Sequence, residues 1–296
     1  MAKRKTFRPI TKAVIAVAGY GTRFLPATKN QPKEMLPIID KPIIQYLVEE
    51  AVASGIKDII LVTRAGQTAL EDYFDSHIEL EHILDKNGKK EALELVRRIP
   101  RMANFIYVRQ KKHLPYGNAS PLLAVKSLIA PDEAFVYMFG DDLVRSKVPA
   151  TKQLMDVFKL HRPAAVLAVQ EVPWEEIRLY GSIKYKQNTK INQIEALVEK
   201  AERTKAYSNL AVFGRFVFSY KVIEEAQKTP LGRGNELWVA DILNRLAQKD
   251  VVIAQPIDGK WLTTGDPLHF LKATVEFALE RPDLGREFHD YLKTVI

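Results

Sequence analysis

Four cations follow two closely spaced glycines near the start of the chain. Gly19 and Gly21 come directly after an apolar run at 13–18 whose valines and isoleucine are typical of a buried parallel strand. Both glycines permit a positive φ and leave room for a ligand, so successive amides can surround an anion. The cations are Arg23, Lys29, Lys33 and Lys41. A basic loop of this composition predicts a polyphosphate site.

The spacing within this loop fits neither of the two common glycine-rich phosphate loops. A dinucleotide fingerprint requires a third glycine where Phe24 stands, and a Walker A loop requires a Gly-Lys-Ser/Thr sequence after its first glycine. An ordinary strand-turn with a solvated basic loop could also contain two such glycines. The longer string of residues around the loop is therefore needed to distinguish a phosphate-binding site from an ordinary turn.

That longer string carries a family resemblance. The residues G-x-G-T-R-F-L-P-A-T-K, followed by P-K-E-M-L-P, resemble the signature of the sugar-1-phosphate nucleotidylyltransferases, most closely the bacterial UTP–glucose-1-phosphate uridylyltransferases. Later motifs similar to those of the family include Gly140-Asp141-Asp142, Leu197-Val198-Glu199-Lys200 and Thr264-Gly265-Asp266. The resemblance implies an enzyme that transfers a uridylyl group from UTP to glucose 1-phosphate, giving UDP-glucose and pyrophosphate, with Mg²⁺ as its cofactor.

Nucleotidyl transfer is an in-line attack by a sugar-phosphate oxygen on the α-phosphorus of the nucleotide. Because the phosphates supply the nucleophile, catalysis is mainly positioning and neutralisation of charge. The resemblance implies that Arg23 and Lys33 stabilise the reacting phosphates. The amides near Gly19, Gly21 and Thr22 would surround those phosphates. A Ser-His-Asp set is neither required nor evident.

The resemblance also implies three residues beyond the loop, one that binds the metal and two that contact the base. Asp141 follows an apolar strand and would hold Mg²⁺, although a strand-end aspartate taken alone is often a helix cap. Gln110 would read the pyrimidine edge, and the backbone near Gly117 would pack against the base. A lone glutamine is otherwise usually an exposed polar residue.

The sugar is implied to bind across the cleft from the nucleotide. Glu199 would bind sugar hydroxyls, and Lys200 would bind the phosphate of the sugar. Gly181 would let the sugar approach the backbone. Glu236, expected to open a helix at 235–248, would contact the sugar or interact with the helix dipole.

Several residues in the implied site depart from the family pattern. Where the family has L-G-L-G-H-A, the chain has L-P-Y-G-N-A, and Pro115 lacks the N–H that could read a uracil oxygen. Thr263 replaces an aspartate that is a second metal ligand in relatives. Trp238 replaces the glutamine of E-I-Q-L-T-D, and Ala201 replaces a proline. Two alternatives therefore stay open, namely another pyrimidine nucleotide or hexose 1-phosphate, and a catalytically weak regulatory paralogue.

Composition narrows the class of protein. The chain has 44 Lys and Arg against 36 Asp and Glu, a net charge of +8, without a motif or concentrated basic face for nucleic acid. A phosphate-rich small substrate explains part of this excess. The absence of cysteine excludes disulfides and thiolate chemistry, and the six histidines lack metal-ligand spacing. No apolar stretch is long enough to span a membrane and the first residues lack a leader's apolar segment, so we expect a cytoplasmic protein.

The order of elements predicts an α/β fold. Strands alternate with helices at 12–163, which indicates a doubly wound, mostly parallel sheet with its site at the carboxyl ends of the strands. This agrees with the GT-A-like fold that the resemblance implies. Strand-like segments at 164–171, 181–186, 191–199 and 209–218 predict a small antiparallel β lobe for the sugar within 164–266. We expect 1–296 to form a single domain, and helices at 267–296 to pack on the core or on another subunit of a homo-oligomer.

Overall fold

A nine-stranded sheet forms the centre of the computed structural model, which describes residues 8–295. Residues 1–7, which hold most of the segment considered above as a leader, and residue 296 lie outside the described residues. The strand order is β10-β9-β11-β6-β1-β4-β5, with β8 beside β11 and β12 beside β8. The strands are β1 (Lys12–Ala16), β4 (Asp58–Thr63), β5 (Asn104–Arg109), β6 (Ala134–Phe139), β8 (Ala165–Glu171), β9 (Gly181–Tyr185), β10 (Ile194–Glu199), β11 (Leu210–Ser219) and β12 (Val252–Pro256).

Strand β11 joins the two parts of this sheet. Strands β5, β4, β1 and β6 run parallel to one another, whereas β11 is antiparallel to β6, β8 and β9. Residues 215–219 of β11 pair with β6, and residues 211–212 pair with β9. The predicted antiparallel lobe is therefore continuous with the main sheet. The α/β fold class is confirmed, with a parallel core and an antiparallel extension.

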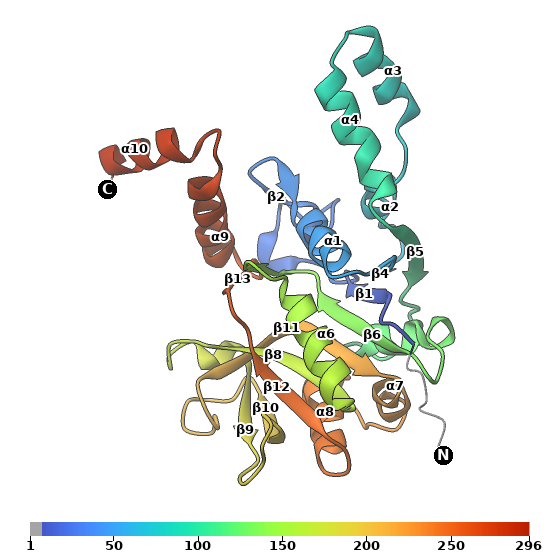
Figure 1. Ribbon diagram of the computed structural model, residues 1–296, viewed down its shortest axis with the longest axis vertical. Helices are drawn as coiled ribbons and strands as arrows, with labels where there is room; N and C mark the ends of the chain where they lie inside the picture. The colour runs from blue at the N-terminus through green and yellow to red at the C-terminus, as the bar shows by residue number, and fades with distance from the viewer. Residues whose placement is uncertain (1–7, 296) are drawn as a thin grey trace.

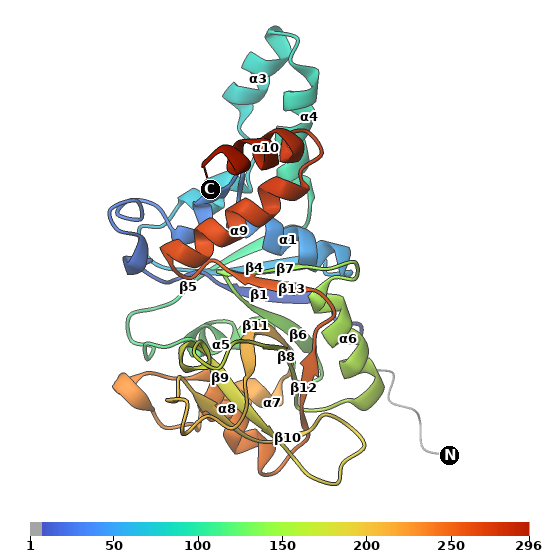
Figure 2. The same ribbon diagram turned by 90° about the vertical axis from the view of Figure 1, so that its left-hand side faces the viewer.

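Helices cover both faces of the sheet, because successive side chains of a strand point to opposite faces and are apolar on both. In β1, Ala13 and Ile15 belong to one buried cluster and Val14 to the other. The first cluster includes residues of α1 (Ile43–Ala53), α6 (Ala150–His161) and α9 (Pro267–Glu280). The second includes residues of α5 (Ser120–Ala124), α7 (Lys221–Ala226) and α8 (Val239–Ala247). Figure 1 and Figure 2 show these helices on either side of the strands.

Two small sheets, which the sequence analysis did not predict, lie beside the main one. Strand β7 (Asp142–Arg145) pairs antiparallel with β13 (Lys260–Thr263), and β2 (Pro37–Ile38) pairs with β3 (Lys41–Pro42). The β7–β13 register places Asp142 opposite Thr263. Residues more than 100 positions apart are thereby brought to the same edge of the fold.

Three helices lie at the periphery. Helices α3 (Ile78–Lys86) and α4 (Lys90–Arg98) form a hairpin that projects away from the sheet, reached through the short α2 (Ala69–Tyr73), as Figure 1 shows. The C-terminal α10 (Gly285–Val295) follows α9 and also extends outward. Within the described part of the chain, none of the helices has both the length and the apolar composition needed to span a lipid bilayer.

Candidate active site

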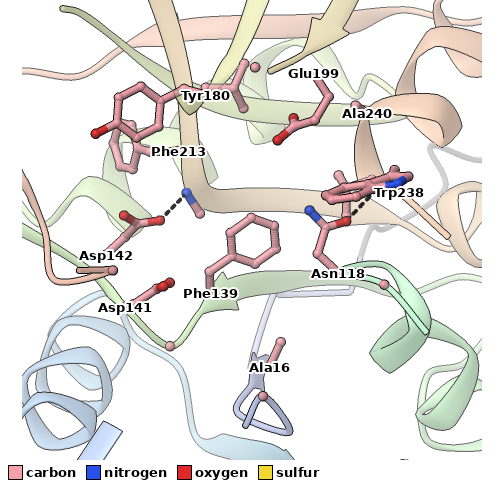
Figure 3. Close-up of a pocket in the computed structure, with 18 of the residues that line it drawn as sticks. Ala16, Asn118, Phe139, Asp141, Asp142, Tyr180, Glu199, Phe213, Trp238 and Ala240 are labelled. Carbon is pink, nitrogen blue, oxygen red and sulfur yellow. Dashed lines mark hydrogen bonds between the residues drawn. The ribbon is translucent and has the colours of Figure 1, made fainter. Parts of the chain in front are cut away.

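A cavity of about 490 Å³ lies between the parallel and antiparallel parts of the sheet. The residues that follow β1, β5 and β6 line it on one side, at the carboxyl ends where a site was expected. Residues of β9, β10 and β11 line the other side. Figure 3 shows Asp141 and Asp142 facing Tyr180 and Glu199 across this space, with Trp238 and Asn118 together at one end.

The two glycines of the basic loop have different physical roles. Gly21 has φ 62° and precedes a 3₁₀ turn at Thr22–Phe24, and a Cβ there would lie 3.2 Å from the Cβ of Lys33. Gly21 is thus required by the turn and by its packing. Gly19 does not have a positive φ, and a Cβ on it would meet nothing within 4 Å. The space above Gly19 is therefore open to a ligand.

The two catalytic cations predicted from the loop line the same cavity as Asp141. Lys33 Nζ lies 2.5 Å from Asp141 Oδ2, and Arg23 Nη1 donates a hydrogen bond to the carbonyl of Gly265 at 2.7 Å. Burial lowers the pKa of Lys33, but the charge and hydrogen bond of Asp141, together with Glu34, outweigh burial and leave that pKa raised. Burial likewise works to raise the pKa of Asp141, yet Lys33 and then Arg23 hold it below its usual value. Both groups are therefore charged at neutral pH.

Asp142 lines the same cavity as Asp141, but its two carboxylate oxygens are held by hydrogen bonds within the fold. Its Oδ2 accepts from the amide of Gly214 at 2.8 Å, and its Oδ1 accepts from Trp261 Nε1 at 2.7 Å. Burial, followed by the charge of Asp141, raises the pKa of Asp142 to about 6. In the sequence, Asp142 is recognisable only as the last residue of Gly140-Asp141-Asp142, which does not predict these hydrogen bonds.

Glu34 is a buried carboxyl that the sequence analysis did not identify. Its side chain lines the cavity, and its Oε2 has no hydrogen-bond partner among the described residues. A Cβ on Gly140 would lie 3.0 Å from Glu34 Oε1, so the carboxyl is packed against that glycine. Burial raises its pKa from 4.5 to about 7, against the attraction of Lys33. The only sequence signal was the position of Glu34 inside the P-K-E-M-L-P string.

The raised pKa of Glu34 predicts a pH-dependent cost to stability. The folded protein keeps this proton up to about pH 7, whereas the unfolded chain loses it near pH 4.5. Stability is therefore lost as the pH rises from 4.5 through 7, by about 3 kcal/mol for a shift of this size. We expect Glu34→Gln to be more stable than the wild type at pH 8 and equally stable at pH 4.5, measured by urea unfolding. Exposed Glu79→Gln is the control, and an equal gain at both pH values would contradict the prediction.

The side of the cavity that was predicted to hold the base is built on close backbone packing. Gly117 has φ 126°, and a Cβ there would lie 2.2 Å from the carbonyl oxygen of Leu237, so only glycine fits. The amide of Leu237 donates to the carbonyl of Tyr116 at 2.7 Å. Asn118 Oδ1 accepts from the amide of Val239 at 2.8 Å, at the first turn of α8. Gln110 follows β5 and lines the same cavity.

The sugar-side residues predicted from the sequence also meet at the cavity. Glu199 and Gly181 are paired across β10 and β9, and a Cβ on Gly181 would lie 3.1 Å from Glu199 Oε2. Burial raises the pKa of Glu199, although Lys200 opposes the shift. Lys200 and Glu236 line the cavity as well. The expectation that Glu236 opens a helix was wrong, because Glu236 is extended and α8 begins at Val239.

The cavity thus gathers most of the predicted site. Of the predicted residues, Gly21 and Thr22 do not line it, whereas the others do: Gly19, Arg23, Lys33, Gln110, Gly117, Asp141, Gly181, Glu199, Lys200 and Glu236. Thr263 lies close to Asp141, since a Cβ built on Gly265 would be 3.3 Å from Thr263 Oγ1 and from Asp141 Oδ2. Residues 8–295 contain no group of three His, Cys, Asp or Glu side chains arranged to hold a metal.

Comparison with known proteins agrees with this geometry. A family described as nucleotidyl transferase matches residues 12–279. The UTP–glucose-1-phosphate uridylyltransferase of Staphylococcus epidermidis is 42% identical over 97% of this chain and 98% of its own length. The UTP–glucose-1-phosphate uridylyltransferase 1 of Staphylococcus saprophyticus is 40% identical over 97% of this chain and 99% of its own length.

Solved structures of similar proteins superpose along most of the chain. A UDP-glucose pyrophosphorylase complexed with UDP-glucose has a TM-score of 0.82 and 35% identity, covering 92% of this chain and 100% of its own. A UTP-bound enzyme of the same type from Acinetobacter baumannii has a TM-score of 0.85 and 34% identity, covering 96% of this chain and 98% of its own.

Proposed function

The chain belongs to the nucleotidyl transferase family, and on that premise we propose that it transfers the uridylyl group of UTP to glucose 1-phosphate. The products would be UDP-glucose and pyrophosphate. One observation carries the proposal. A single cavity joins the Arg23, Lys33 and Asp141 cluster to the Glu199–Lys200 pair on the opposite side. Such a cavity can hold a nucleoside triphosphate and a sugar phosphate together.

The reaction would form one P–O bond and break another. A phosphate oxygen of glucose 1-phosphate attacks the α-phosphorus of UTP while the bond from that phosphorus to the β-phosphate oxygen breaks. Lys200 would hold the attacking phosphate and Glu199 the sugar hydroxyls. Arg23 and Lys33 would stabilise the charge that develops on the phosphates, because preformed cations in a partly buried cleft need little reorganisation. Gln110 and the backbone at Gly117 would orient the base.

A divalent cation, which we propose to be Mg²⁺, would be held by the carboxylate of Asp141. The donors fit, because carboxylate oxygen is a preferred ligand of Mg²⁺, and this ion usually takes one or two carboxylates together with substrate phosphates. Asp141 Oδ2 faces the cavity near Thr263 Oγ1, and the pKa of Asp141 lies below its usual value. When bound, such an ion would neutralise charge on the nucleotide phosphates.

Thr263→Asp provides a test of the metal site. The new carboxylate would lie near Asp141 and supply a second ionised oxygen ligand, so the Mg²⁺ concentration for half-maximal rate should fall about tenfold, equivalent to about 1.4 kcal/mol of binding. Titration of activity against Mg²⁺ in both proteins measures this. Thr264→Ser, at the next residue, is the matched control and should leave the metal dependence unchanged. An equal dependence in wild type and Thr263→Asp would place position 263 away from the metal.

Pyrophosphate release across four nucleoside triphosphates and several sugar 1-phosphates tests the reaction itself. We expect the highest kcat/KM for UTP with glucose 1-phosphate. Pro115, which lacks an amide donor beside the base, favours a second candidate with another pyrimidine nucleotide, and a preference for that nucleotide would replace UTP in the proposal. No release with any pair would favour the regulatory paralogue. Assembly into a homo-oligomer and a cytoplasmic location remain predictions.

A further inference from the structure

The ammonium of Lys200 faces an aromatic ring rather than a carboxylate. Lys200 Nζ lies 5.1 Å from the centroid of the Trp238 ring. Among residues 8–295 the lysine forms no ion pair, although Glu199 precedes it in the chain. A carboxylate partner would neutralise the cation and occupy its donors. The face of an indole attracts the cation without neutralising its charge, so N–H groups that point away from the ring can bind an anion.

The Trp238 ring is held in place from several directions. Its Nε1 donates a hydrogen bond to the carbonyl of Arg233 at 2.9 Å, so the indole N–H is not available to a substrate. The residues on either side are fixed by the bonds of Leu237 to Tyr116 and of Val239 to Asn118. Figure 3 shows Trp238 beside Asn118 at the end of the cavity. The ring therefore presents its face, without a polar group, to the lysine.

The backbone of Lys200 is constrained as well. Its φ of 48° is left-handed, and its amide donates to the carbonyl of Tyr180 at 2.9 Å. The side chain is exposed, and a lysine loses much rotamer freedom when it is fixed against a ligand. A ring that already holds the ammonium at the cavity reduces this loss on binding.

We propose that Trp238 is a positioning residue that holds Lys200 for the phosphate of the sugar 1-phosphate. The proposal rests on the proposed function, in which Lys200 binds that phosphate. It gives a physical role to Trp238, which stands where the family pattern has a glutamine. Trp238 acts through Lys200 and carries no charge or donor to the reacting atoms.

Binding of UDP-glucose and of UMP, measured by calorimetry, tests the proposal. UDP-glucose contains the phosphate next to the sugar, and UMP lacks it. We expect Trp238→Leu to weaken UDP-glucose binding about threefold to tenfold, the range of a cation–π contact at a partly exposed site, and to leave UMP binding within about twofold of the wild type. KM for glucose 1-phosphate should rise in parallel, with little change in KM for UTP. Trp238→Phe, which keeps a ring, should restore most of the binding.

A double-mutant cycle with Lys200→Met separates positioning from a direct contact with the sugar. In the Lys200→Met protein, Trp238→Leu should cause no further loss. Trp174→Leu is the matched control, since Trp174 lies under Arg203 at 5.8 Å and does not line the cavity. Trp238→Gln provides a second ring-free variant, and thermal melting checks that each protein is folded.

Three results would overturn the inference: unchanged UDP-glucose binding in both ring-free variants, no rescue by phenylalanine, or an undiminished loss in the Lys200→Met background. Each of these three results concerns the variants and leaves the proposed function of the wild-type protein intact. A wild-type protein that binds UMP but neither binds UDP-glucose nor releases pyrophosphate with glucose 1-phosphate would instead refute the proposed function, and the inference with it.

Discussion

Replacement of Lys33 or Arg23 by alanine is expected to lower kcat by about 10²–10³-fold, the usual effect of removing a group that stabilises transition-state charge. Lys33 is the nearest cation to Asp141, at 2.5 Å, and Arg23 is fixed by the Gly265 carbonyl. The two cations lie in separate parts of the loop, Arg23 in the 3₁₀ turn at Thr22–Phe24 and Lys33 in that at Lys33–Met35. Steady-state rates with UTP and glucose 1-phosphate at saturation measure the effect.

Lys29→Ala is the control for this prediction, because Lys29 is an exposed cation of the same loop that does not line the cavity. It should retain kcat within about threefold, since an exposed charge outside the cavity is largely screened by solvent. Circular dichroism and thermal melting should show that all three variants are folded. Unchanged kcat in both Lys33→Ala and Arg23→Ala would remove the loop from the catalytic site.

Arg215→Met is expected to destabilise the protein by about 3–5 kcal/mol, the cost of leaving a buried charge without its partner. Arg215 is fully buried and forms a two-pronged ion pair with Glu50 of α1, with an N–O distance of 2.8 Å. Its guanidinium also donates to the carbonyls of Gly214 and Asp142. The pair therefore connects α1 to the strand ends beside the cavity. The midpoint and slope of urea unfolding at pH 7 measure the loss.

The pKa of Glu50 provides a second way to check this role. Burial works to raise that pKa, but Arg215 holds it below its usual value of 4.5. The stability supplied by the pair is therefore present above pH 4.5 and lost as the pH falls through the lower folded value. The difference in the free energy of unfolding between wild type and Arg215→Met should therefore decrease as the pH falls below 4.5. Arg281→Met, which removes a more exposed pair with Asp40, should cost much less, and equal losses would contradict the prediction.

Local patterns were sufficient to predict most of the elements. The strand-like segments predicted at 181–186 and 209–218 match β9 and β11 to within one residue, because short apolar runs between polar residues favour buried strands. The helix predicted at 235–248 instead begins at Val239 and ends at Ala247. Strands β7 and β13 were missed since each has only four residues, and their pairing depends on segments far apart in the chain.

The sequence by itself determined the family, the mostly parallel α/β fold class and the basic loop, because motif spacing and hydrophobic period are local properties. It indicated which residues belong to the site but not which groups surround them. The tertiary structure decided that Glu34 is buried without a partner for Oε2 among residues 8–295. It also joined Asp142 to Gly214 and Trp261 by hydrogen bonds, and placed Trp238 against Lys200. Burial and long-range packing set these features, and neither can be deduced from neighbours in the chain.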